Sequence, residues 1–177
     1  MRLYISFKGQ DFRRYVTALS RLETSVPVIA DGMCRYGAIE YKTLVIGAIA
    51  MQNFVTRVPK LKKKYLEWKI EHGFPRQIGV LQHDLLGNIV AMPWVGGGWF
   101  GGVDPDARDL GNKNWGLRGG SNLVAKYACW LEEGNRDGEP DSQVRRPIFM
   151  PIAKRYAKTE YPKQLAKAGQ RIESRWF

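Results

Sequence analysis

The stretch YACWLEEGNRDGEPDSQVRRPIFMP, residues 127–151, decides how the rest of the chain can be arranged. It begins apolar, turns acidic at Glu132 and Glu133, and then breaks at a glycine. A polar loop follows, and the chain returns to order through Arg145, Arg146 and the run PIFMP. We interpret the stretch as a hinge between two packed elements that share a loop. It contains no catalytic triad and no metal-ligand cluster.

Helical patterns lie on both sides of this hinge. Residues 122–131 place apolar side chains on one helical face, which predicts a short helix before the loop. Residues 147–168 predict a longer, basic helix, in which Pro162 marks a kink or a restart. We expect residues 169–177 to form a C-terminal tail, and its final pair, Trp176 and Phe177, to dock on a protein surface.

The upstream chain alternates between strand and helix patterns. The periodicities predict a strand at 3–7 and helices at 12–22, 28–55 and 61–72, and enrichment in β-forming residues predicts a strand at 88–94. Pro27 is expected in the first turn of the helix at 28–55. The apolar stripe of that helix fits either a core helix or an interface helix in an oligomer.

Residues 96–120 are rich in glycine and aspartate and predict an arm followed by an extended loop. Trp99 and Phe100 in this arm need a surface to bury against. That surface could be the core of the same chain or a neighbouring subunit. A calcium loop is excluded, because the positions that need a glycine and a glutamate hold Asp109 and Trp115.

Composition and charge indicate one globular domain that spans residues 1–177, with 44% hydrophobic and 25% charged residues. The net charge is +11, distributed as +8 over residues 1–79, −4 over 80–144 and +7 over 145–177. Such a chain could bind nucleic acid, or one face of a subunit could meet the opposite face of the next. No signal peptide or membrane span is expected.

The two cysteines, Cys34 and Cys129, both lie in apolar periodic segments. We predict two buried free thiols in a reducing compartment rather than a disulfide. A lone histidine beside one acid, as at His83 or His72, predicts neither a metal site nor a relay. No catalytic residue, metal or cofactor is therefore expected.

A lysine cluster precedes the helix at 61–72 and comprises Lys60, Lys62, Lys63 and Lys64. It could contact phosphates, or it could be a solvated helix end that pairs with acidic side chains. Together with the basic C-terminal helix, it keeps a nucleic-acid-binding protein as the alternative function.

The hinge resembles a motif of the tailed-phage neck and tail-completion family, which includes the lambda minor tail protein Z-like and Mu virion morphogenesis-like head–tail joining proteins. The family's Glu-aromatic-Gly-Thr corresponds to Glu-Glu-Gly-Asn at 132–135, and its Arg-Pro-Phe to Arg-Pro-Ile-Phe at 146–149. Residues 78–89 resemble the family's strand entry. The N-terminal strand and helix and the Gly/Asp insert at 96–120 depart from the family pattern.

This resemblance implies an α+β fold, with helices packed on a small antiparallel sheet, and a structural virion protein rather than an enzyme. The implied assembly is a ring of identical subunits, a hexamer or, against the connector, a dodecamer. Its partners would be a connector or neck protein and the tail tube or terminator, with viral DNA in the lumen weakly contacted at most. The protein would lie in the virion neck or tail, after assembly in the host cytoplasm. Interface residues are expected in the arm, the hinge and the C-terminus, namely Trp99, Phe100, Glu132, Glu133, Arg145, Arg146, Trp176 and Phe177.

Overall fold

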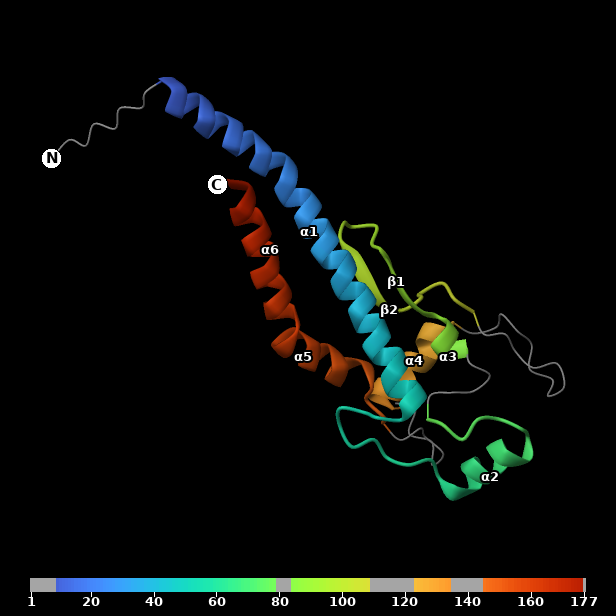
Figure 1. The fold of residues 1–177 in the computed structure, drawn as a ribbon. Coiled ribbons are helices and arrows are strands. Elements are labelled where there is room, and N and C mark those ends of the chain that lie inside the picture. The colour runs from blue at the N-terminus through green and yellow to red at the C-terminus, as the bar shows by residue number, and fades with distance from the viewer. Residues whose placement is uncertain (1–8, 79–83, 109–122, 135–144, 177) are drawn as a thin grey trace.

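A single long helix organises the molecule. The computed structural model describes residues 9–78, 84–108, 123–134 and 145–176. Helix α1, Gly9–Met51, runs for 43 residues through the centre of the fold. Helices α5 and α6 lie along one side of it and a β-hairpin along another (Figure 1). The predicted strand at 3–7 lies outside the described residues.

Helix α1 corrects the prediction of two helices separated near Pro27. The proline lies inside the helix, where its ring nitrogen cannot donate a hydrogen bond to the carbonyl four residues earlier. One turn earlier, the Thr24 hydroxyl donates to the backbone carbonyls of Ser20 and Arg21, at 3.2 and 3.1 Å. The helix nevertheless continues through the proline, and its contacts with the hairpin and with α5 and α6 lie along the part of α1 that follows (Figure 1).

The hairpin confirms the predicted strand at 88–94. Strand β1, Ile89–Pro93, pairs antiparallel with β2, Trp99–Val103, in a register that sets Ile89 opposite Val103 and Pro93 opposite Trp99. The turn between them holds two glycines at positive φ, which a residue with a side chain rarely adopts. This small antiparallel sheet beside α1, in a chain that is otherwise mostly helical, confirms the α+β fold class.

Three short helices complete the connections around α1. Helix α2, Lys63–Glu71, confirms the helix predicted at 61–72, and Gly73 closes it at a φ of +71°. Helix α3, Asp84–Gly87, leads into β1. Helix α4, Val124–Glu133, confirms the helix predicted before the hinge loop. The loop itself, from 135 to 144, lies outside the described residues.

The C-terminal part forms two helices, as the proline at 162 predicts. Helix α5, Phe149–Thr159, ends just before helix α6, Tyr161–Trp176. The predicted tail at 169–177 is wrong up to its last residue, because α6 continues to Trp176. The helix pairs with α1 there, which supplies a packing surface that sequence periodicity does not reveal. Phe177 lies outside the described residues.

The hydrophobic core gathers at the C-terminal end of α1. Its fully buried side chains come from α1, β1, α4 and the residue before α5, and they are Val45, Ile49, Ile89, Val124 and Ile148. Within the described residues, no helix is long and apolar enough to cross a membrane.

Candidate functional site

The centre of the candidate site is the junction between α4 and α5. Helix α5 begins after Ile148, whose side chain cannot accept a hydrogen bond to cap the helix. The carboxylate of Glu132, at the end of α4, accepts instead from the backbone N–H of Ile148 at 2.6 Å and from that of Phe149. A negative charge at a helix N-terminus is favourable because the first N–H groups lack helical partners. Glu132 therefore caps α5 from sixteen residues earlier in the chain.

Two arginines close the same junction from the other side of the loop. The Arg146 backbone N–H donates to the Leu131 carbonyl at 2.7 Å, and Arg145 Nε donates to the Glu132 carbonyl at 2.8 Å. The Arg146 guanidinium is buried and donates to the carbonyls of Pro59 and Lys60, at 3.1 and 3.3 Å. Burial lowers the pKa of Arg146. The arginine thus ties the segment before α2 to the hinge.

The junction also contacts α1. The Tyr41 hydroxyl donates to the Phe149 carbonyl at 3.1 Å. Burial, together with the charge of Glu132, raises the pKa of Tyr41 to about 12. We call these five residues the hinge clasp: Tyr41, Glu132, Arg145, Arg146 and Phe149. In this structure Glu132, Arg145 and Arg146 use their polar atoms within their own chain, whereas the sequence predicted them as interface residues.

The arm packs against its own chain. Trp99 Nε1 donates to Asp31 Oδ1 on α1 at 2.9 Å, and the Arg35 guanidinium lies 5.4 Å from the centre of the Trp99 ring. Phe100 lies against Trp94, with ring centres 5.4 Å apart. Both aromatics are half-buried and make these contacts within their own chain, outside the hydrophobic core. Asp31 carried no sequence signal, because its partner lies 68 residues away.

Three predicted interface residues remain, and none of them belongs to the hinge clasp or the arm. Glu133 is exposed at the end of α4. The side chain of Trp176 and the whole of Phe177 lie outside what the structure describes.

The lysine cluster is solvent-exposed at the start of α2. Lys63 lies 3.7 Å from Glu67, one helical turn later, in an exposed ion pair. The aromatic rings of α2 stack on one another rather than standing free, with Tyr65 and His72 at 5.6 and 4.9 Å from Trp68. The cluster therefore resembles a solvated helix end more than a platform for stacking bases.

A second basic surface lies along α5 and α6. Lys163 pairs with Glu160 at 3.0 Å. The exposed cations of these two helices are Lys154, Arg155, Lys158, Lys163, Lys167 and Arg171.

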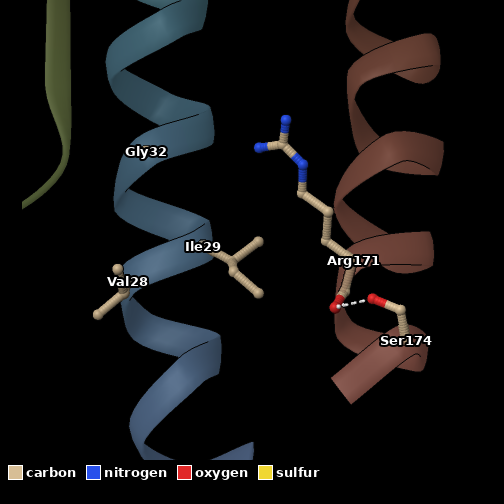
Figure 2. Close-up of a pocket in the computed structure, with 5 residues that line it drawn as sticks. All are labelled: Val28, Ile29, Gly32, Arg171 and Ser174. Carbon is tan, nitrogen blue, oxygen red and sulfur yellow. Dashed lines mark hydrogen bonds between the residues drawn. The ribbon is translucent and has the colours of Figure 1, made fainter. Parts of the chain in front are cut away.

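A shallow hollow opens between α1 and α6, with a volume of about 460 Å³. Ile29 points from α1 toward α6, and Arg171 reaches from α6 into the space between the helices (Figure 2). Gly32 contributes no side chain, and Ser174 Oγ donates to the Arg171 carbonyl at 3.0 Å. One cation on an open apolar wall lacks the converging polar groups of a small-molecule site.

The cysteines overturn one prediction. Cys34 and Cys129 are free, but both are exposed rather than buried. Each follows a more buried neighbour, Met33 or Ala128, and a step of one residue in an α-helix turns the side chain by about 100°. Across the described residues, no three His, Cys, Asp or Glu side chains gather as a metal site would require.

Comparison with known proteins finds no matching family model, no matching curated protein and no matching solved structure.

Proposed function

We propose that the chain is a structural subunit of a tailed-phage neck or tail end, acting in head–tail joining or tail completion. It would work by stoichiometric assembly into a ring rather than by turnover. Its neighbours would be further copies of itself, a connector or neck protein, and the tail tube or terminator.

One observation carries this proposal. Three residues of the motifs behind the family resemblance, Glu132, Arg146 and Phe149, belong to the hinge clasp, which ties together α1, α4, α5 and the segment before α2. The motif thus has a concrete task in this chain: it fixes the start of the C-terminal helices on the central helix. The clasp uses its polar atoms to hold the fold together, which suits a subunit that works by assembly.

Mass measurement and electron microscopy test the proposal together. Purified protein is expected to give a hexamer or dodecamer by light scattering, with rings in negative stain. Phage that lacks the protein is expected to yield heads and tails that do not join, or tails with an unfinished end. Normal virions in its absence would refute the assignment.

The basic surfaces support nucleic-acid binding as a second candidate function. The exposed cations of α5 and α6 and, separately, the lysine cluster at the start of α2 could neutralise phosphates. Binding to duplex DNA should then weaken steeply as salt rises, and replacing Lys158 and Lys167 by glutamine should flatten that dependence. Glu160→Gln on the same surface is the control, because it removes a charge of the opposite sign. Absence of binding at low salt would rule this function out.

A further inference from the structure

The end of α1 carries a glutamine in a conformation that favours glycine. Gln52 follows the last residue of the helix and has a φ of +53°. Its backbone N–H donates to the Ile49 carbonyl at 3.3 Å, and the Asn53 N–H donates to the Ala48 carbonyl at 3.1 Å. Such paired bonds close many helices, and glycine is the usual residue at the position that Gln52 occupies. A side chain here strains the backbone, which points to a task for that side chain.

The task is to join two parts of the chain that lie 26 residues apart. Gln52 Oε1 accepts from the Ile78 backbone N–H at 2.8 Å, and Gln52 Nε2 donates to the Ile78 carbonyl at 3.2 Å. One side-chain amide thus pairs with both backbone groups of a distant residue. The segment between them, residues 53–77, therefore leaves α1 and returns to the same place. We call this segment the α2 unit, because it contains α2.

The α2 unit is held together by contacts of its own. Lys69 is buried, and its Nζ donates to the Gln77 carbonyl at 2.8 Å. The Trp68 ring stacks with those of Tyr65 and Phe74, with ring centres 5.6 and 5.4 Å apart. The Phe74 N–H also donates to the Lys69 carbonyl at 2.7 Å. Helix α2 and the turn that follows it therefore support each other.

The α2 unit stands apart from the other helices. Figure 1 shows α2 away from them and from the hairpin. Phe54 and Ile78, beside the joint with α1, pack against the hydrophobic core. In the first part of the unit, the Arg146 guanidinium donates to the carbonyls of Pro59 and Lys60 at 3.1 and 3.3 Å. These contacts attach the unit at its two ends and at one point before α2.

We propose that the α2 unit swings as one body about the joint between Gln52 and Ile78, and that Arg146 is the latch that holds it against residues 127–151. Movements of this kind turn about a few residues at the ends of elements, and the joint lies at the end of α1. The latch consists of two hydrogen bonds from one buried guanidinium. Because the unit contains seven basic and two acidic residues, its movement displaces a net charge of +5. The device goes beyond the proposed function and does not depend on it.

The test measures the distance between two spin labels on the full-length chain by pulsed electron paramagnetic resonance. Both native cysteines are free and exposed, so Cys34→Ser with Cys129→Ser removes them as labelling sites. The labels are placed at Thr43→Cys on α1 and Glu71→Cys on α2, both exposed positions. With Arg146 intact, the protein should give one narrow distance distribution. Arg146→Gln should add a second population at longer distance, and so should Arg146→Lys, which keeps the charge but loses the planar donor fork.

Arg145→Gln is the matched control for the latch. Arg145 is the neighbouring cation, and its Nε donates to the Glu132 carbonyl rather than to the α2 unit. Its replacement should leave the distance distribution narrow. Equal broadening in the Arg145 and Arg146 variants would overturn the latch.

Gln52→Asn tests the joint. Asparagine tolerates a positive φ and keeps the amide, but its side chain is one methylene shorter and does not reach Ile78 in the same way. Exchange of the Ile78 N–H with solvent, followed by NMR, should therefore accelerate by about fivefold or more, the change expected for the loss of one hydrogen bond. An unchanged exchange rate would overturn the joint.

Hydrogen exchange also separates swinging from unfolding. Unchanged exchange at Val45 and Ile49 in the core shows that the variants are folded. A second distance in the Arg146 variants, with the amides of α2 as protected as in wild type, supports the proposal. Loss of protection throughout α2 overturns it, because the unit then unfolds rather than swings. A narrow distribution in both Arg146 variants, or an equally broad one with Arg146 intact, overturns it as well.

Discussion

Removing the carboxylate of Glu132 should destabilise the whole C-terminal part of the fold. The carboxylate accepts hydrogen bonds from the first two backbone N–H groups of the α5 start, at Ile148 and Phe149. A hydrogen bond to a charged group contributes roughly 1.5–3 kcal/mol, and a negative charge at a helix N-terminus adds about 0.3–1 kcal/mol. Both bonds use one oxygen, so their contributions do not add fully.

Glu132→Ala should therefore lower the free energy of unfolding by about 2–4 kcal/mol, a large part of the 5–15 kcal/mol typical of a domain. Glu132→Gln keeps an acceptor but loses the charge, and should cost about half as much. Urea unfolding followed by circular dichroism measures both, at one fixed protein concentration because assembly would shift the midpoint.

The neighbouring Glu133→Ala is the control. Its side chain is exposed, so its effect should stay within about 0.5 kcal/mol. If Glu132→Ala also stays within that range, or if the two alanine variants lose equal stability, the capping role is refuted.

Three further perturbations probe the contacts around the clasp. Arg146→Lys keeps the charge but loses the planar donor fork that holds the segment before α2. Trypsin should therefore cleave that segment faster than in wild type, and equal cleavage rates would show that Arg146 does not hold it in place. Gly101→Ala should destabilise, because its new methyl group would meet the α1 backbone at 3.1 Å, whereas Gly47→Ala meets nothing within 4 Å and should stabilise α1 by up to about 1 kcal/mol. The melting temperature should fall in Gly101→Ala and rise in Gly47→Ala, and shifts of the same sign in both variants would contradict this prediction. Burial raises the pKa of Tyr41 and Tyr156 to about 12 in the fold, against about 10 for an unfolded tyrosine. The unfolded state therefore loses these protons first, and stability should fall as pH rises from about 10 toward 12. The double phenylalanine variant should show a flatter fall in the urea midpoint, and an unchanged slope would exclude these two groups as its cause.

Local patterns account for much of the observed fold. Enrichment in β-forming residues predicted the strand that became β1, and helical spacing predicted α2 and α4 close to their observed bounds. Pro162 predicted the break between α5 and α6. These features depend on residues within a few positions of one another, which is the range over which sequence periodicity carries information.

The failures have a common physical cause. Pro27 predicts a helix boundary by its missing donor, but α1 continues through it and packs against distant parts of the chain. Cys34 and Cys129 lie in apolar segments, yet which side of a helix is covered depends on where its neighbours pack. The C-terminal tail is helical because α1 offers it a surface.

The hinge at 127–151 shows most clearly which features depend on the local sequence and which depend on the tertiary structure. The sequence by itself determined that an acidic helix end, a loop and an Arg-Pro anchor occur there. Only the tertiary structure decided that Glu132 caps α5 and that Arg146 holds carbonyls 86 and 87 residues away. Hydrogen bonds across such separations depend on how the chain folds back on itself, and residue spacing does not encode that distance.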